Sequence, residues 1–373
     1  MKKVLIVGML DSVHLARWLE QFKEEKIEFF LFPSSPMRRL HPLVRQLIFE
    51  SGNALYRIPS WAKWAALPLW LLDKAFSNSI RALLLRYTVR KFEPTHVHLI
   101  EFQNAGYIGV RAFAKFPVRT FKLICTNYGS DIFWFRQFPA HLAKIRALLR
   151  LCDIYSAECE RDVQLARNLG FKGQVMPVRP NAGGFKPEVL SSPLSEDAAR
   201  NLIMVKGYHG WVGRAKIALE AIRLIQSDLK DLELVVFSSN GSVARDAEKL
   251  GTELGLAVRV YKKGTLPHET ILELFSQAKV YIGLSLSDGI STSLLEAMAM
   301  GAIPVQTNSA CCSEWFSSSG VTVRDLRPVA VANSIREALG LSKIEANRIR
   351  NRETVTMRAS DQTARQDSLG YYT

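Results

Sequence analysis

The chain has 373 residues, 48% of them hydrophobic and 23% charged. This composition is ordinary for a globular enzyme with large cores, and the length favours two domains over one. The formal charge of +14 is uneven, because residues 1–178 carry 26 Lys+Arg against 14 Asp+Glu, whereas residues 179–373 carry 23 against 21. A basic half joined to a nearly neutral half indicates that one domain faces an anionic surface or substrate.

The five cysteines exclude a disulfide scaffold or a zinc site. None has C-x-x-C spacing or a neighbouring histidine in a zinc pattern, which predicts reduced core thiols in a cytosolic chain. The apolar run at residues 4–10 is interrupted by Gly8 and has no small-residue cleavage site, so it predicts a first strand rather than a signal peptide. No stretch reaches the roughly 18 apolar residues of a membrane-spanning helix. We therefore expect a cytoplasmic protein.

The first half of the chain alternates strands with helices. A helix is predicted at residues 11–26 from its one-sided apolar pattern. Strands are predicted at residues 4–7, 27–32, 96–102, 121–125 and 152–156. This alternation predicts an α/β domain with a parallel sheet, over residues 1–178.

The alternation breaks between residues 38 and 91, where we expect a helical insertion. Glu50 and Asp73 are the only carboxylates between Glu28 and Glu93. The tryptophans and basic residues of its later part are Trp61, Trp64, Trp70, Arg57, Lys63, Lys74, Arg81, Arg86, Arg90 and Lys91. Two interpretations stay open: a solvated basic face, or a surface for an anionic membrane or acceptor.

The second half repeats the α/β alternation after a linker. Residues 179–199 are the predicted linker, because the region from 177 to 195 is rich in proline and has little apolar periodicity. Strands are predicted at residues 202–205, 232–237, 258–261, 280–284, 303–305 and 321–323. They define a second domain at residues 200–345. The polar tail, 346–373, is expected to be a last helix that packs back on the first domain, or a frayed end.

A candidate ligand site follows the strand at residues 280–284. Asp288 and Gly289 end the strand region, and a predicted helix carries Glu296 one turn further on. In open α/β sheets, ligands lie where strands end and helices begin, and a helix N-terminus suits a phosphate. Glu296 could accept hydrogen bonds from a ribose, and Asp288 could hold a sugar. The residues between them are Ile290, Ser291, Thr292 and Ser293. Alternatively, the hydroxyls only cap this helix and Glu296 is a solvated surface acid.

The same stretch resembles the glycosyl transferases group 1 family. The resemblance rests on Asp288-Gly289, on LLEAMA at residues 294–299, on Gly301 and on Pro304-Val305. It implies the GT-B architecture, in which two Rossmann-like domains face each other across a cleft, and a retaining glycosyltransferase. The family signature is two glutamates separated by seven residues. Here Asp288 takes the first position, with a carboxylate one methylene shorter, and Glu296 takes the second.

The resemblance assigns roles to further residues of the second half. Lys206, at a strand end, and Arg214, at a helix start, are expected to bind the donor diphosphate, although an exposed helix face would also explain Arg214. Lys263 is expected to lie beside the nucleobase. Each charge-assisted bond to phosphate contributes about 1.5–3 kcal/mol. These cations make a metal unnecessary, so no metal ligands and no cofactor are predicted.

In the first half, polar residues at strand ends are predicted to line the acceptor side. The turn after the first strand resembles a family glycine loop, although G-x-G-x-x-G is absent. The segment TNYGSD resembles the family's His-Gly-x-Asp turn, with Tyr128 in place of histidine. The predicted residues are Gly8, Ser12, His14, Glu101, Gln103 and Asp131. A helix-capping or half-buried role for His14, and a turn-capping role for Asp131, are the alternatives.

The predicted function is a retaining transfer of a sugar from a nucleotide-diphospho-sugar, of the UDP or GDP type, to an acceptor hydroxyl. A saccharide or lipid-linked saccharide acceptor is expected, as in surface polysaccharide, lipopolysaccharide or glycolipid assembly. The protein would then be cytoplasmic. If the basic insertion binds an anionic membrane, the protein would also bind peripherally to the inner face of the plasma membrane. The alternatives are a GT-B nucleotide-sugar epimerase or hydrolase, and a non-catalytic nucleotide-binding protein. Nucleic acid is not expected, because the basic residues lack a regular aromatic platform.

Overall fold

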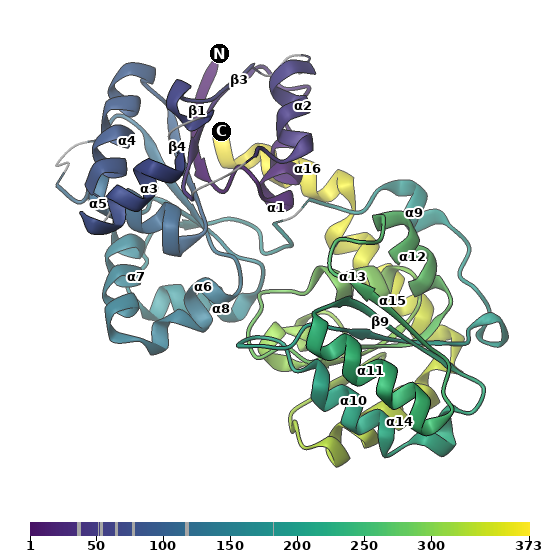
Figure 1. The fold of residues 1–373 in the computed structure, drawn as a ribbon. Helices are drawn as coiled ribbons and strands as arrows, with labels where there is room; N and C mark the ends of the chain where they lie inside the picture. Colours follow the sequence, from purple (N-terminus) through teal and green to yellow (C-terminus); the bar gives the residue numbers. More distant parts are fainter. Residues whose placement is uncertain are drawn as a thin grey trace. The chain divides into compact units, whose positions relative to one another are not determined.

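The computed structural model describes residues 1–35, 39–50, 52, 55–63, 66–76, 79–115, 119–181 and 183–373. It divides into two compact units (Figure 1). The first unit comprises Met1–Gly184 together with Asp361–Thr373, and the second comprises Phe185–Ser360. The second unit is therefore inserted, in sequence, between two parts of the first.

The sheet of the first unit has seven parallel strands in the order β3-β2-β1-β4-β5-β6-β7. In its register, Val4 lies opposite Phe29 on one side and His96 on the other. The strands are β1 (Lys2–Gly8), β2 (Ile27–Pro33), β3 (Leu55–Arg57), β4 (His96–Ile100), β5 (Lys122–Thr126), β6 (Ile154–Ser156) and β7 (Gln174–Val175). The predicted α/β class is confirmed. The described part of the predicted insertion, 38–91, consists mainly of helices and includes the short strand β3.

Helices cover both faces of this sheet. Leu5 and Val7 of β1 enter one apolar core and Val4 and Ile6 enter the other, as the two-residue period of a strand requires. The first core is closed by α4 (Ser79–Phe92), α5 (Tyr107–Phe113), α7 (Pro139–Leu151) and α8 (Glu160–Asn168), and the second by α1 (Val13–Glu20) and α2 (Pro42–Glu50). The remaining α-helices in the described part of residues 1–184 are α3 (Ala66–Ala75) and α6 (Ser130–Phe133).

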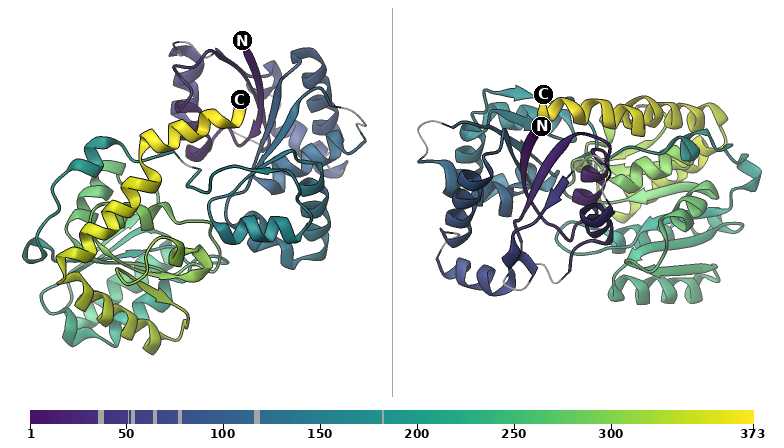
Figure 2. Two further views of the ribbon diagram at one scale, coloured as in Figure 1. Left: turned by 180° about the vertical axis from the view of Figure 1, so that it is seen from behind. Right: turned by 90° about the horizontal axis from the view of Figure 1, so that it is seen from above.

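The end of the chain completes the second of these cores. After α16 (Asp361–Leu369), the side chains of Tyr371 and Tyr372 are 0% and 1% exposed. The hydroxyl of Tyr372 accepts a hydrogen bond from Trp18 Nε1 at 3.2 Å and lies 2.8 Å from His98 Nδ1. Figure 2 shows this segment, in yellow, beside the first strand, in purple. Residues from both ends of the sequence thus share one core.

The second unit has a six-stranded parallel sheet in the order β10-β9-β8-β11-β12-β13. Its strands are β8 (Leu202–Lys206), β9 (Glu233–Ser239), β10 (Val258–Lys262), β11 (Ala278–Gly283), β12 (Ile303–Thr307) and β13 (Val321–Val323). One face packs against α10 (Ala215–Arg223), α11 (Gly241–Leu254) and α14 (Pro328–Ser342), and the other against α12 (His268–Ser276), α13 (Thr292–Ala299) and α15 (Glu345–Ala359) (Figure 1). The short helix α9 (Pro187–Ser191) precedes β8.

Among the described helices, none combines the length and the apolar character that crossing a membrane requires. The five cysteines, all in the described part of the chain, are buried free thiols.

Candidate active site

The carboxyl edge of the second sheet brings several predicted site residues together. Lys206 is the last residue of β8, and its Nζ donates a hydrogen bond to Ser291 Oγ at 2.9 Å. The loop that contains Ser291 is tied to the next strand end, because Ser285 N donates to Thr307 Oγ1 at 2.9 Å. A parallel sheet places the ends of all its strands at one edge, where such ligand sites form.

Ser291 precedes α13 but does not cap it with its side chain. It stands at the N-cap position, and no side-chain capping bond is found there among the described residues. Instead its hydroxyl accepts from Lys206, which holds an ammonium group at the positive end of the α13 dipole. Thr292 and Ser293 follow, both half-buried. The alternative in which these hydroxyls only cap the helix is therefore wrong for Ser291.

Lys206 keeps its charge in this setting. Burial by itself would lower the pKa of Lys206, but the nearby oxygens of Tyr208, Tyr281 and Asp288 raise that pKa overall. The ammonium group also lies 5.0 Å from the centre of the Tyr208 ring. A fixed cation at a helix N-terminus is an arrangement that binds phosphate.

Arg214 also lies at this edge, at the N-cap of α10. Its backbone N–H donates to Leu284 O at 2.8 Å, which joins its loop to the end of β11. Its guanidinium donates to the carbonyl oxygens of Gly213, at 2.8 Å, and Gly210. Arg214 is half-buried and braces its own loop, so it is not simply part of an exposed helix face.

Glu296 is buried, with only 6% of the residue exposed. Its Oε1 lies 2.7 Å from Nε2 of His268, the first residue of α12. The alternative of a solvated surface acid is therefore wrong. Sequence reasoning missed His268, because only the fold brings the loop after β10 over α13. The exposed Lys263 lies in the same loop.

Asp288 and Ile290, in the loop before α13, have different surroundings. Asp288 is half-buried, and its Oδ1 accepts a hydrogen bond from Gly289 N at 3.0 Å. Its own N–H donates to Ser309 O, beyond the end of β12, at 3.2 Å. The Ile290 side chain is 4% exposed and packs in the core with Leu294. The Ile290 side chain therefore serves packing, and a ligand would meet this position through its backbone.

In the first unit, the turn after β1 holds three predicted residues. A Cβ on Gly8 would lie 3.3 Å from Leu15 Cδ2, so the absence of a side chain lets α1 pack closely on the strand. Ser12 caps α1, accepting from His14 N at 3.2 Å. The His14 ring is exposed and lies 5.7 Å from the ring of Tyr128, a residue of the TNYGSD segment.

Glu101, Gln103 and Asp131 form one cluster in the first unit. Asp131 Oδ2 accepts from the N–H groups of Phe102 and Tyr128, both at 3.0 Å, and Gln103 Nε2 donates to Asp131 O at 3.0 Å. Glu101, with φ of 74°, accepts from the N–H groups that follow it, including that of Ala105 at 2.6 Å. Burial raises the pKa of both carboxyls, and the charge of Glu101 adds to the rise in the pKa of Asp131. Asp131 therefore does cap its turn, and a ligand-binding role for it stays a prediction.

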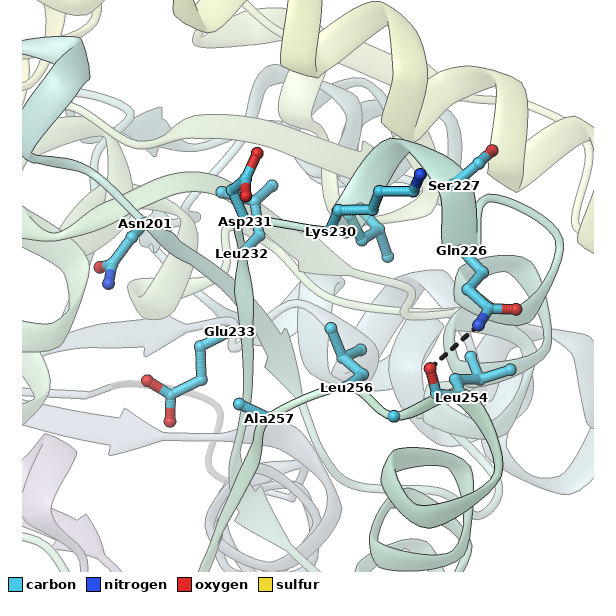
Figure 3. A pocket seen from close by; sticks show the side chains of 12 residues that line it. Asn201, Gln226, Ser227, Lys230, Asp231, Leu232, Glu233, Leu254, Leu256 and Ala257 are labelled. Carbon is cyan, nitrogen blue, oxygen red and sulfur yellow. Dashed lines mark hydrogen bonds between the residues drawn. The ribbon is translucent and has the colours of Figure 1, made fainter.

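The second unit also has a cavity of about 750 Å³ at the opposite edge of its sheet (Figure 3). It is lined by residues that precede strands, among them Asn201 before β8, Asp231 before β9 and Leu256 before β10. Gln226 Nε2, at its rim, donates to Leu254 O at 2.9 Å. Its lining includes none of the predicted site residues, all of which the structure describes. The candidate site at the carboxyl edge is therefore separate from this cavity.

The second unit also matches a known protein family. Residues 191–352 match the glycosyl transferases group 1 family, a range that contains every predicted site residue of the second unit. No match is found among curated protein sequences. The resemblance inferred from residues 288–305 is thereby confirmed.

Solved structures share the fold along the whole chain. A sucrose-phosphate synthase from Thermosynechococcus elongatus matches with a TM-score of 0.68 and 14% identity, covering 100% of this chain and 98% of that one. Anabaena HepE, solved with UDP-glucose, has a TM-score of 0.66 and 12% identity, with 100% of this chain and 99% of that one covered. The apo form of the lipopolysaccharide outer core galactosyltransferase WaaB has a TM-score of 0.69 and 12% identity, with 100% of each chain covered.

Two parallel α/β units of this kind constitute the GT-B fold, as the sequence predicted. Residues 191–352 match the glycosyl transferases group 1 family, and the chain is a glycosyltransferase.

Proposed function

We propose that this protein is a retaining glycosyltransferase that moves a sugar from a nucleotide-diphospho-sugar to an acceptor hydroxyl. The observation that carries the proposal is the Lys206 ammonium group, hydrogen-bonded to Ser291 Oγ at the N-terminus of α13. The matched family supports the same chemistry. A saccharide or lipid-linked saccharide is the proposed acceptor, in surface polysaccharide, lipopolysaccharide or glycolipid assembly.

The second unit is proposed to bind the donor. In sugar transfer the bond between the sugar and the diphosphate breaks, and negative charge develops on the leaving phosphate. Lys206, Arg214 and the N-terminus of α13 would stabilise that charge without a metal ion, as preorganised donors and cations do in general. Glu296 would accept from the ribose hydroxyls, and Asp288 would hold the sugar. As the family resemblance implies, the leaving phosphate would accept the proton of the acceptor hydroxyl. No separate general base is then needed.

A uridine nucleotide is the first choice of donor. Anabaena HepE shares the fold and is solved with UDP-glucose, at 12% identity, and another structure of it, at 13% identity, holds UDP and glucose. Lys263 and the loop that follows it are proposed to lie beside the base, where backbone groups make much of the contact.

The first unit is proposed to bind the acceptor. WaaB, a lipopolysaccharide outer core galactosyltransferase, has the same fold at 12% identity, which supports a surface-glycan acceptor. The basic charge of residues 1–178 favours an acceptor that is anionic or that lies at an anionic membrane surface. The proposed contacts are Gly8, Ser12, His14, Glu101, Gln103 and Asp131.

The first test is a thermal-shift panel with UDP, GDP, ADP and their sugars. A ligand of the native state raises the unfolding midpoint by mass action, so UDP and UDP-sugars should give the largest shifts. A panel without any shift would contradict the nucleotide-sugar donor.

The second test compares products formed from donor alone with those formed from donor plus an acceptor extract. Transfer requires the acceptor, whereas an epimerase or hydrolase converts the donor alone. Nuclear magnetic resonance of the product reports whether the anomeric configuration is retained. Asp288→Ala should lower turnover while sparing UDP affinity, and equal loss of both would refute the sugar-holding role of Asp288.

A further inference from the structure

Helices α3 and α4 of the first unit expose large apolar side chains together. On α3, Leu67, Leu71 and Leu72 are 45%, 56% and 53% exposed, and Phe76, just beyond it, is 59% exposed. On α4, Leu83 and Tyr87 are 55% and 62% exposed. Contiguous exposed apolar residues mark interaction surfaces, whereas isolated ones need no explanation. We call these six residues the leucine face.

The spacing of these residues gathers them on one side of each helix. Leu67 and Leu71 are four residues apart on α3, as are Leu83 and Tyr87 on α4, so each pair shares a helix face. The two helices pack against one another and lie side by side in Figure 1.

A buried ion pair holds the two helices in place. Asp73 Oδ1 accepts from the N–H groups of Ile80 and Arg81, at 2.8 and 3.1 Å, and Asp73 Oδ2 pairs with Arg81 Nε at 2.5 Å. The same guanidinium donates to Ser34 O, which connects α4 to the loop after β2. The hydrogen bonds therefore hold α3 and α4 in a defined position, in which the side chains of the leucine face are exposed.

This ion pair corrects the predicted basic surface. Arg81 is only 4% exposed, so it does not belong to an exposed cationic patch. The side chains of Lys63 and Lys74, which the same prediction used, lie outside the described part of the structure. Arg90 and Lys91, at the end of α4, are exposed as expected.

The charged residues of α4 outside the buried ion pair are all basic. Arg86 is half-buried, and Arg90 and Lys91 are exposed. An apolar surface next to exposed cations matches the interface of an anionic bilayer, where leucine and aromatic side chains enter the acyl boundary and Lys/Arg attract the headgroups.

We propose that the leucine face docks the protein on an anionic lipid bilayer by inserting its side chains among the lipids. The proposal deepens the proposed function, because a docked enzyme would meet a lipid-linked acceptor at the membrane surface. The cations add attraction, but the apolar side chains carry the binding.

Vesicle flotation with the full chain tests the proposal. The probes are vesicles of phosphatidylcholine alone and of phosphatidylcholine with phosphatidylglycerol, at low and high salt. The protein should float with the anionic vesicles, and salt should remove only part of the binding, since screening weakens attraction but not insertion. Leu71→Glu/Leu72→Glu should lower vesicle binding at least tenfold at both salt concentrations.

The control is Leu224→Glu, because Leu224 lies in the second unit and is exposed to a similar degree, at 49%. It should leave vesicle binding unchanged. A fluorophore at Leu71→Cys gives a direct readout, because the five native cysteines are buried. Its emission should shift to the blue on vesicles, as it does for a probe in an apolar environment.

Three outcomes would overturn the proposal. They are no flotation with anionic vesicles, equal flotation of the double variant, and a concentration-dependent dimer that Leu71→Glu/Leu72→Glu dissolves, since a second copy would then cover the face. UDP binding is measured on the same preparations. Its absence would contradict the proposed function but not the docking, because vesicle binding needs neither donor nor acceptor.

Discussion

His268 Nε2 and Glu296 Oε1 are 2.7 Å apart, joining the first turn of α12 to α13. The Glu296 side chain is 8% exposed, whereas that of His268 is 42% exposed. A buried carboxylate with a partner of this kind has a fixed orientation before any ligand binds. Preorganisation of that sort lowers the cost of binding.

Glu296→Gln should weaken UDP binding by about 1.5–3 kcal/mol, because the ribose loses a charged acceptor. His268→Ala should weaken it less, since the carboxylate stays but loses its orientation. Isothermal titration calorimetry measures both, with Glu269→Gln, an exposed acid next to His268, as the matched control. Unchanged UDP affinity in Glu296→Gln would remove this residue from the site.

Activity should survive EDTA. In the proposed site, the Lys206 ammonium group, which is hydrogen-bonded to Ser291 at the N-terminus of α13, would neutralise the diphosphate in place of a metal. Lys206→Ala should lower turnover more than about tenfold, which corresponds to about 1.4 kcal/mol. Arg214→Ala should do the same, partly through its loop, because the guanidinium braces the carbonyls of Gly210 and Gly213.

Turnover rates with and without EDTA check this, with Lys216→Ala as the control. Lys216 follows on the same helix and forms a half-exposed pair with Asp246 at 2.9 Å. An enzyme that loses activity in EDTA and regains it with manganese would contradict the metal-free site. So would a Lys206/Arg214 double variant with normal rates.

Removal of the buried Tyr372 should destabilise the protein strongly. Tyr372→Ala leaves a cavity beside Trp18 and His98 and should cost about 3–5 kcal/mol, as truncations of large buried side chains do. Phe49→Ala, at a residue that is 70% exposed, should have little effect. Urea unfolding followed by circular dichroism compares the two, and similar midpoints would contradict the burial of the C-terminal residues.

His98 should make stability depend on pH. Its ring lies between Tyr372 OH, at 2.8 Å, and Thr126 Oγ1, at 2.7 Å, and burial lowers its pKa from 6.5 to about 3. Between these values the unfolded chain binds the extra proton, so this contribution is complete above pH 6.5 and is lost as the pH falls towards 3. The slope from one such group is at most about 1.4 kcal/mol per pH unit.

His98→Gln isolates this effect, because it removes the titrating group and leaves the others. His96 has a lowered pKa, which acts in the same direction, and the raised pKa values of buried carboxyls such as Asp162 act in the opposite direction. Urea unfolding at pH 5 and pH 7 should therefore show a smaller pH difference in His98→Gln than in the unchanged protein. Equal differences would contradict a neutral, buried His98.

The parts that could be predicted from sequence depend on neighbours along the chain. The strand, glycine turn and helix around Asp288 lie within one short segment, so their order alone indicated a ligand site. The pairing of His268 with Glu296 depends on where the edge strand β10 lies in the sheet, which local patterns do not encode. Likewise, seven cations in one stretch predicted an exposed patch, but tertiary contacts with Asp73 and Ser34 bury Arg81.

The interleaved order of the two units affects how the protein is made. The first unit receives Tyr371 and Tyr372 only from the last residues of the sequence, after all of Phe185–Ser360. Domains generally fold as units during synthesis, the N-terminal one first. Here the amino-terminal core must wait, with Trp18 and His98 uncovered, while the ribosome translates the whole inserted unit. The first unit can therefore complete this core only after the inserted unit has been synthesised.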